Sequence, residues 1–191
     1  NSSKDILEAT VSDLNAVKDR DPSCKYFSEP LLFFKGFKAL QSHRVASWLW
    51  SEERHTLAHF IQSRASEVYG IDIHPAAEIG KGVMIDHGSG VVIGETAVVE
   101  DNVSIFQGVT LGGTGKETGD RHPKVREGAL LSASSTILGN VEIGKNAKVA
   151  AGSVVLADVR EHTTVAGIPA KEVGEANTDM PAYDVDHSIN N

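Results

Sequence analysis

One histidine of this sequence stands among acids in a way that suits proton transfer. Residues 85–90 read IDHGSG, so His87 directly follows Asp86, and a further acid, Asp72, precedes them in the chain. An imidazole near neutral pH is the usual general base, and a carboxylate usually fixes its tautomer and orientation. Because adjacent residues of a strand point to opposite sides, we expect Asp72 rather than Asp86 to orient His87. The competing interpretation is an ordinary surface histidine in a turn.

A second group of polar residues, Asp120, Arg121 and His122, lies in the stretch GDRHPK. The planar guanidinium of Arg121 matches the geometry of a carboxylate. Upstream, the stretch TLGGTGK offers backbone N–H groups that suit a phosphate or a developing oxyanion, although it lacks the P-loop spacing. The competing interpretation of this group is a solvated charged loop.

Three histidines, His74, His87 and His122, raise the alternative of a metal site. Structural and catalytic zinc sites commonly use closely spaced ligand pairs completed by a thiolate or a carboxylate. No His-x₃₋₅-His pair and no obvious completing carboxylate surrounds these positions. We therefore expect no metal.

The elements that must position these groups follow a period of six residues from Ile71 onward. Six is neither a helical period nor a simple alternation. It is the hexapeptide repeat of a parallel β-helix, in which each repeat forms one face of a triangular coil. The repeating aliphatic positions are Ile73, Ile79, Ile85, Ile93, Val99, Ile105, Leu111, Val125, Leu131, Ile137, Ile143, Val149 and Val155.

The repeat is interrupted twice, and each interruption contains one of the histidines. The first interruption, at residues 86–92, holds His87, and the second, at residues 112–124, holds His122. Insertions in solenoids map to loops, and loops carry function. We therefore expect an extended loop at about residues 112–124.

The stacking of coils predicts which residues share an edge of the prism. Counting through the first interruption places Ile85 under Ile105 and His87 beneath Gln107. Asp72 lies about one coil before the interruption, on the same edge, which favours its pairing with His87.

The chain before the repeat has the spacing of helices instead. Helices are expected at about Lys4–Val17, across a second segment that begins near Pro30, and at Glu52–Tyr69 with Gly70 as its C-cap. The inward face of the second comprises Leu31, Phe34, Phe37, Leu40, Val45, Trp48 and Leu49, and that of the third comprises Leu57, Phe60, Ile61 and Val68. The fold class is therefore α+β, with an α-helical subdomain at 1–70, a β-helix at 71–173 and a flexible tail at 174–191.

Composition excludes several classes of function. The net charge is −8 and the pI is near 5.4, which disfavours nucleic acid as a partner. No apolar run approaches the roughly 20 residues of a membrane helix, so no membrane is expected. The single cysteine, Cys24, allows no internal disulfide and reads as an ordinary free thiol, which suits a cytoplasmic protein.

The motifs together resemble the serine acetyltransferase family. They are the helices ahead of the repeat and the stretches DIHPAAEIGKGVMIDHGSGVVIGETAVV, TLGGTGK, GDRHPK, ILGNVEIG, AGSVV and AGIPAK. The resemblance extends from about Asp13 to about Val173. It implies a left-handed β-helix, an exception to right-handed crossovers. It also implies transfer of acetyl from acetyl-CoA to the L-serine hydroxyl, giving O-acetyl-L-serine for cysteine biosynthesis.

The resemblance implies roles for the polar residues named above. His87 resembles the general base that accepts the serine hydroxyl proton, and Asp72 resembles its carboxylate partner. Asp86 matches a contact to the serine amino group and Arg121 a contact to its carboxylate. The remaining substrate-binding positions implied are His122 and Asp21, the latter in the stretch RDP.

The resemblance also implies a groove for acetyl-CoA. The amide of Gly113 matches the donor to the thioester oxygen, and Ala133, Lys148 and Ala151 match positions along the groove. Lys171 belongs to AGIPAK, which matches the strand that closes the groove and approaches phosphates. Two stretches depart from the family: DHGSG replaces the usual DHATG, and LSASSTILG replaces a version richer in Gly and Ala.

The partners implied are a homotrimer with its active site between neighbouring β-helices, and L-cysteine as a feedback inhibitor. A dimer of trimers stays open because the helical region is shorter than usual. Many members end in an isoleucine that docks into O-acetylserine sulfhydrylase, whereas this chain ends in SINN. Either the tail is truncated or that complex does not form. The alternatives to this activity are an acetyltransferase for another hydroxyl acceptor, such as a sugar, and a non-catalytic β-helix scaffold.

Overall fold

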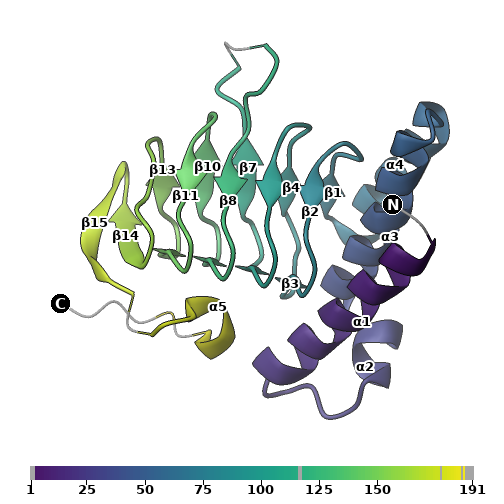
Figure 1. Cartoon of the computed structure of the whole chain (residues 1–191), viewed down its shortest axis with the longest axis horizontal. Helices are drawn as coiled ribbons and strands as arrows, with labels where there is room; N and C mark the ends of the chain where they lie inside the picture. Colours follow the sequence, from purple (N-terminus) through teal and green to yellow (C-terminus); the bar gives the residue numbers. More distant parts are fainter. Residues whose placement is uncertain (1–2, 116–117, 177, 186, 188–191) are drawn as a thin grey trace.

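The computed structural model describes residues 3–115, 118–176, 178–185 and 187. Four helices gather at one end of a long β-helix, and a short fifth helix lies beside it (Figure 1). The helices are α1 (Ser3–Arg20), α2 (Ser28–Leu32), α3 (Lys35–Ser51), α4 (His55–Tyr69) and α5 (Pro181–Asp184). No helix among the described residues is long and apolar enough to cross a membrane. Residues 188–191, which bear on the sulfhydrylase prediction, lie outside the described residues.

The predicted second helix is in fact two helices. The chain leaves helical geometry at Phe34, whose φ of −84° and ψ of 109° are extended, so α2 and α3 are separate elements. Leu31 and Val45 are exposed, contrary to the predicted inward face. Because the extended residue Phe34 separates α2 from α3, one helical stripe no longer applies to both.

The predicted inward face of α4 is also wrong. Leu57, Phe60 and Val68 are exposed, whereas Ala58 is fully buried. Helix α4 packs mainly on α3, and a small side chain lets the two backbones approach closely. The predicted C-cap is confirmed, because Gly70 is left-handed at φ 67° and its N–H donates to the Ser66 carbonyl at 2.9 Å.

Three sheets form the sides of the β-helix, and strands within each sheet come from successive coils. Sheet A contains β1 (Asp72–Ile73), β4 (Val92–Ile93), β7 (Thr110–Gly112), β10 (Thr136–Leu138) and β13 (Val154–Val155). Sheet B contains β2 (Glu78–Ile79), β5 (Val98–Val99), β8 (Lys124–Val125) and β11 (Glu142–Ile143). Sheet C contains β3 (Met84–Ile85), β6 (Ser104–Ile105), β9 (Leu130–Leu131), β12 (Lys148–Val149), β14 (Thr163–Gly167) and β15 (Ala170–Glu175).

Neighbouring strands pair in parallel, and the predicted register is confirmed where Ile85 pairs with Ile105. The exception is the antiparallel hairpin of β14 and β15. The stretch AGIPAK spans the turn of this hairpin rather than one strand, which corrects the sequence interpretation.

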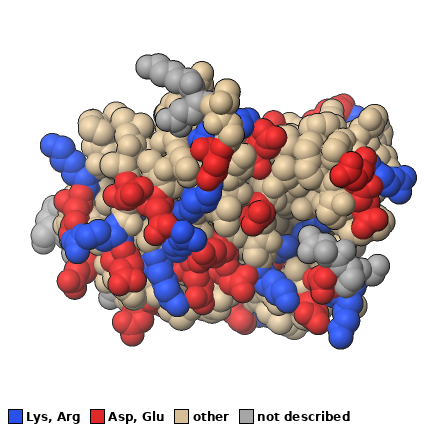
Figure 2. Space-filling view, turned by 45° about the horizontal axis from the view of Figure 1, so that its top comes forward, with Lys and Arg blue, Asp and Glu red and all other residues tan. Residues whose placement is uncertain are grey.

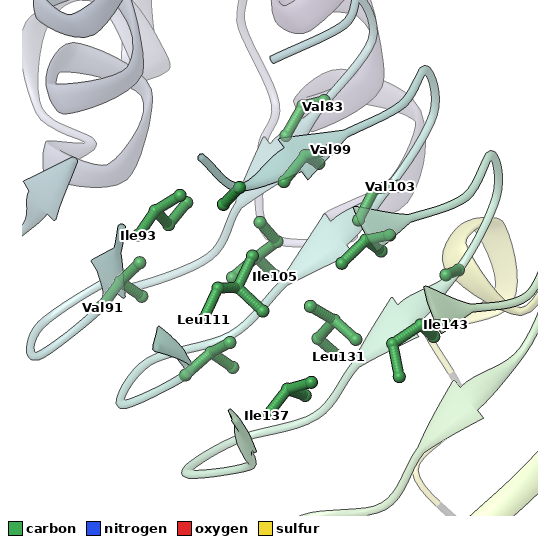
Figure 3. Packing of buried hydrophobic residues seen from close by; sticks show 14 of the residues in the cluster. Val83, Val91, Ile93, Val99, Val103, Ile105, Leu111, Leu131, Ile137 and Ile143 are labelled. Atoms are coloured by element: carbon green, nitrogen blue, oxygen red, sulfur yellow. The ribbon is translucent and has the colours of Figure 1, made fainter. Parts of the chain in front are cut away.

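The core is a stack of aliphatic side chains along the axis of the β-helix. Ile105, Leu111 and Ile137 are fully buried, and Figure 3 shows them pointing inward from successive coils. Burial of each such aliphatic side chain stabilises the fold by about 1.5–3 kcal/mol. The period of six places these side chains in the core, coil after coil. The second interruption leaves the coil after β7 as a projecting loop, as predicted (Figure 1).

A buried ion pair joins the helices to the first coil. Asp13 of α1 is fully buried, and its carboxylate accepts hydrogen bonds from Arg44 of α3 at 2.7 and 2.8 Å. Asp13 also accepts from the Val83 amide at 3.1 Å, and Arg44 donates to the Gly80 carbonyl at 2.7 Å. Two helices and the first coil therefore meet at one charged contact.

The segment expected to be a flexible tail includes β15 to Glu175 and helix α5. Ala182 is fully buried, and its carbonyl accepts a hydrogen bond from the Ser104 hydroxyl at 2.8 Å. The Arg20 guanidinium lies 4.1 Å from the ring centre of Tyr183. The described part of α5 thus packs between the end of α1 and sheet C.

Candidate active site

His87 occupies a turn at the corner between sheets C and A. Its φ is 53°, and Gly88 and Gly90 follow with φ of 76° and 78°. A Cβ atom on Gly88 would lie 2.5 Å from the Ile71 Cδ1 atom, so glycine fits this turn both by conformation and by space. The imidazole is three-quarters exposed, because the insertion carries it off the sheet.

Asp86 lies closer to His87 than the strand argument predicted. The His87 Nε2 and Asp86 Oδ2 atoms are 3.9 Å apart. Because His87 is left-handed rather than extended, the alternation of strand side chains does not apply to this pair. Asp86 is half-buried, and this burial, with a smaller contribution from Asp21, raises the pKa of its carboxyl.

A cavity of about 280 Å³ brings three of the predicted residues together. Asp21, from the segment after α1, lines it with Asp86 and His87. Sequence reasoning missed Lys35, which also lines the cavity and whose ammonium donates to the Ser89 hydroxyl. Ser89 lies within the first interruption, in the stretch DHGSG that departs from DHATG. Its hydroxyl therefore has a structural partner in Lys35.

The second polar group lies at the corner between sheets A and B. The Arg121 guanidinium donates to Glu95 at 2.7 Å. The Thr96 hydroxyl oxygen accepts from the Arg121 and His122 amides at 3.0 and 3.1 Å. Sequence reasoning missed Glu95 and Thr96, which follow Gly94 in the repeat GETAVV and carried no distinguishing spacing.

His122 is held in one tautomer. Its Nδ1 atom accepts a hydrogen bond from the Thr96 amide at 3.1 Å and lies 2.9 Å from the Thr96 hydroxyl. Burial, and then the neighbouring Arg121, lower the pKa of the imidazole. A neutral ring that accepts at Nδ1 carries its proton on Nε2, which lies near both Gly94 and Gly113. A Cβ atom on Gly94 would lie 2.1 Å from this ring, so glycine makes room for it.

Asp72 begins sheet A and is hydrogen-bonded to helix α4. Its Oδ1 atom accepts from Gln62 Nε2 at 2.8 Å. Among the described residues no hydrogen bond or ion pair joins Asp72 to His87, so their pairing stays a prediction. The Gly90 amide donates to the Gly70 carbonyl at 2.7 Å, which ties the His87 turn to the segment just before Asp72.

The residues predicted to bind acetyl-CoA are distributed over two corners. Ala133 and Ala151 lie in successive turns of the corner between sheets C and A, where the Gly152 amide donates to the Ala133 carbonyl at 2.9 Å. Lys148 is buried in β12, and Lys171 is exposed in β15. Gly113 lies instead beside His122. Their roles stay predictions.

The chemistry-bearing residues thus form two half-sites on different corners of one chain. The first half-site is Asp21, Asp86 and His87, and the second is Glu95, Thr96, Arg121 and His122. Within the described ranges, no group of three or more His, Cys, Asp or Glu side chains could hold a metal ion.

Known proteins resemble this chain over nearly its whole length. Residues 1–42 match the family model "Serine acetyltransferase, N-terminal", and residues 122–157 match "Bacterial transferase hexapeptide (six repeats)". The serine acetyltransferase of Salmonella typhimurium strain LT2 is 53% identical over 97% of this chain and 68% of its own length. That of Haemophilus influenzae is 52% identical over 96% of this chain and 69% of its own length.

Solved structures agree. The serine acetyltransferase of Vibrio cholerae O1 superposes with a TM-score of 0.97 at 54% identity, covering 99% of this chain and 73% of that one. A serine acetyltransferase in complex with cysteine has a TM-score of 0.95, with 50% identity over 97% of this chain and 72% of that one. The enzyme of Brucella abortus in complex with coenzyme A has a TM-score of 0.90, with 52% identity over 92% and 70%.

A left-handed β-helix of hexapeptide turns, joined to N-terminal helices and carrying polar insertions at its corners, defines an acyltransferase of the hexapeptide class. Within that class, the chain belongs to the serine acetyltransferase family. It is an enzyme that transfers acetyl from acetyl-CoA to the hydroxyl of L-serine.

Proposed function

We propose that His87 is the general base for direct attack of serine on acetyl-CoA. The observation that carries this is the convergence of Asp21, Asp86 and His87 on one cavity. The unprotonated imidazole accepts the serine Oγ proton while Oγ bonds to the thioester carbonyl carbon. The carbon–sulfur bond then breaks, and the CoA sulfur leaves with the proton that His87 returns. Both substrates are held together, and no acyl-enzyme forms.

The two acids of the cavity suit the ammonium group of serine. Asp86 and Asp21 present carboxylates beside His87, so an ammonium bound there places the serine hydroxyl near the imidazole. Arg121, which already holds the Glu95 carboxylate, would exchange that partner for the serine carboxylate. The Nε2–H group of neutral His122 supplies a further donor.

We expect acidification to weaken serine binding through Asp86. Its pKa is raised by burial, so the anionic form that binds ammonium is lost at a higher pH than for an ordinary aspartate. The KM for serine should rise as pH falls through this range, while the KM for acetyl-CoA changes little. Asp86→Asn should raise the serine KM by about tenfold or more, since a charged hydrogen bond contributes about 1.5–3 kcal/mol. An Asp86→Asn enzyme with the wild-type pH dependence of serine KM would contradict this role.

We propose that the two half-sites meet across a subunit interface. They lie on different corners of one chain, so a neighbouring copy would supply the half that each cavity lacks. The turns that follow the strands of sheet B bear surface ion pairs such as Arg126–Glu100 and Lys145–Glu127. Outward positions of sheet A, such as exposed Val92, carry mostly uncharged residues. Figure 2 shows charged side chains gathered in a band beside a largely uncharged surface. These features support the expected trimer.

Mixed oligomers test the shared site. His87→Ala and Arg121→Ala, each inactive alone, should regain roughly a quarter of wild-type activity when co-expressed in equal amounts. Each site takes its two half-sites from two copies chosen at random, and each half-site is intact in half of the copies. About a quarter of the sites therefore have both halves intact. A mixture of His87→Ala with Asp86→Ala is the control and should gain no activity beyond that of the Asp86→Ala enzyme itself, since both residues belong to the same half-site. Equal recovery in both mixtures, or in neither, would mean that the half-sites do not combine between copies.

The ligands of the relatives fit the same assignment. Relatives have been solved with coenzyme A, with serine and with cysteine. We infer that the backbone amide of Gly113 donates to the thioester oxygen and that Ala133, Lys148, Ala151 and Lys171 line the acetyl-CoA groove. Cysteine differs from serine only in sulfur for oxygen, so we infer that it competes for the Asp86 cavity as a feedback inhibitor. Cytoplasmic location and a dimer of trimers stay predictions.

A further inference from the structure

A chain of hydrogen bonds runs from the surface of α4 to Asp72. Gln62 Nε2 donates to Asp72 Oδ1 at 2.8 Å, and Gln62 Oε1 lies 3.0 Å from His59 Nδ1. We propose that Gln62 is a positioning residue that orients Asp72 for His87, and that His59 holds Gln62 in place. The inference rests on the proposed role of His87 as the general base and on the predicted role of Asp72 as its carboxylate partner.

The direction of every hydrogen bond in this chain is determined by chemistry. An ionised carboxylate only accepts, so the Gln62 amide must turn its NH₂ group toward Asp72. Its carbonyl oxygen then faces His59 and needs a donor, so His59 carries a proton on Nδ1. Both ends therefore select the same orientation of the amide, and a flipped amide would lose both bonds.

The His59 ring is itself held at its edges. It packs nearly perpendicular to Trp50, with ring centres 5.2 Å apart, and to His74, with centres 5.5 Å apart. Edge-to-face packing of this kind favours one ring orientation. The ring of His59, an exposed residue of α4, is thereby oriented. The oriented ring in turn orients the Gln62 amide, which binds Asp72 at the start of sheet A.

The consequence for Asp72 is a restricted carboxylate. With Oδ1 bound by Gln62, rotation of the group is limited, and the other oxygen has a preferred direction. A general base needs its carboxylate partner at a defined angle, because the partner selects the tautomer and orientation of the imidazole. Catalytic hydrogen bonds are often long in free enzymes and shorten when substrate binds. An Asp72 carboxylate that is already oriented needs less rearrangement to form such a bond with His87.

Removal of the amide should slow the chemical step without weakening cofactor binding. Gln62→Leu keeps the approximate size and removes both hydrogen bonds. We expect kcat to fall about tenfold, less than the 10² that a 1 Å misplacement can cost, with an unchanged KM for acetyl-CoA. His59→Phe keeps a ring against Trp50 and His74 but removes the N–H donor, so kcat should fall a few-fold.

Gln41 offers a matched control. Gln41 Nε2 donates to the Asp13 carboxylate at 2.9 Å, and its Oε1 accepts from the Thr10 hydroxyl at 2.6 Å. This is the same local chemistry, a glutamine between an aspartate and a donor, away from the His87 cavity. Gln41→Leu should lower the unfolding temperature while kcat stays within twofold of wild type, which separates positioning from general stability.

Two further variants test whether Gln62 acts through Asp72. Combined with Asp72→Asn, Gln62→Leu should cause little additional loss of kcat, because the residue it orients is already disabled. Gln62→Glu places one carboxylate against another, so its activity relative to wild type should rise as pH falls and the new Glu gains a proton to donate. His59 contacts Gln62 directly, and His74, which packs against His59, has Asp72, Glu95 and Arg121 as its charged neighbours. Both enzymes share these groups.

The outcomes separate this inference from the function on which it depends. Near-normal turnover of Asp72→Asn would remove Asp72 from the mechanism, and the positioning role would end with it. An impaired Asp72→Asn enzyme with a Gln62→Leu enzyme within twofold of wild type would overturn the positioning role alone. An equal loss from Gln62→Leu with and without Asp72→Asn would also overturn it. A loss that disappears in the Asp72→Asn background supports it.

Discussion

His87→Ala is expected to lower kcat by about 10²–10⁴, the contribution of a positioned general base. The serine hydroxyl is a poor nucleophile until its proton is accepted as it attacks, and His87 is the imidazole of the Asp21–Asp86 cavity. The variant should still fold, because the replaced ring is three-quarters exposed. Release of CoA from serine and acetyl-CoA, measured with a thiol reagent, gives the rate.

His162→Ala is the matched control for that experiment. His162 is exposed and left-handed at φ 53°, the same value as His87, so both variants place alanine in the same strained conformation. We expect His162→Ala to have wild-type kcat and the same small loss of stability as His87→Ala. Turnover of His87→Ala within a few-fold of His162→Ala would show that His87 is not the base.

The repeat was the most predictable feature, because the same positions of each six residues face the core, as Val103 and Ile105 do. The pairing of Ile85 with Ile105 followed from counting through an insertion of known length. The corners were predictable as places of function for the same reason: any residue outside the period must leave the coil. His87 and His122 were found this way without knowledge of their neighbours.

The side chains that hold those histidines were not predictable, because tertiary placement brings them together. Thr96 holds His122 from the preceding coil, and Gln62 reaches Asp72 from a helix. Nothing in their sequence spacing distinguishes them from ordinary polar surface residues. The argument that separated Asp86 from His87 failed for a local reason, since it assumed extended backbone where His87 is left-handed.

The helical faces failed for a related reason. A stripe of large apolar residues predicts burial only when something packs on it, and Phe60 and Val68 of α4 are exposed. The contact that joins the helices to the first coil is instead polar, between Asp13 and Arg44. The hydrophobic period could not locate this polar contact. Its contribution to the free energy of unfolding can be measured by mutation.

Arg44→Leu is expected to lower the free energy of unfolding by about 3–5 kcal/mol. Removing one partner of a buried ion pair leaves the other charge without compensation, and Asp13 is fully buried. The variant also leaves the Gly80 carbonyl without its donor. Urea unfolding at one fixed protein concentration measures the loss, since the stability of an oligomer depends on concentration. Arg126→Leu, which removes exposed ion pairs with Glu100 and Glu142, is the control and should cost at most about 1 kcal/mol.

The loss in Arg44→Leu should depend on pH with a definite sign. Burial raises the pKa of Asp13 even against Arg44, whose hydrogen bonds and charge act to lower it. Without Arg44 the folded-state pKa rises further, so the folded state binds a proton that the unfolded state has released. Stability is then greatest below the unfolded pKa of about 3.9 and declines as pH rises through the folded pKa. The difference between variant and wild type should therefore grow from acidic to neutral pH.

A double variant separates the buried charge from the lost contacts. Asp13→Leu with Arg44→Leu removes both charges, so it should recover part of the stability lost by Arg44→Leu alone and lose the pH dependence of the difference. The Gly80 carbonyl still lacks its donor, and the Val83 amide now loses its acceptor as well, so recovery should be incomplete. If the double variant is as unstable as Arg44→Leu at neutral pH, the cost lies in the lost hydrogen bonds to the first coil. In that case the charge of Asp13 is not what makes Arg44 necessary.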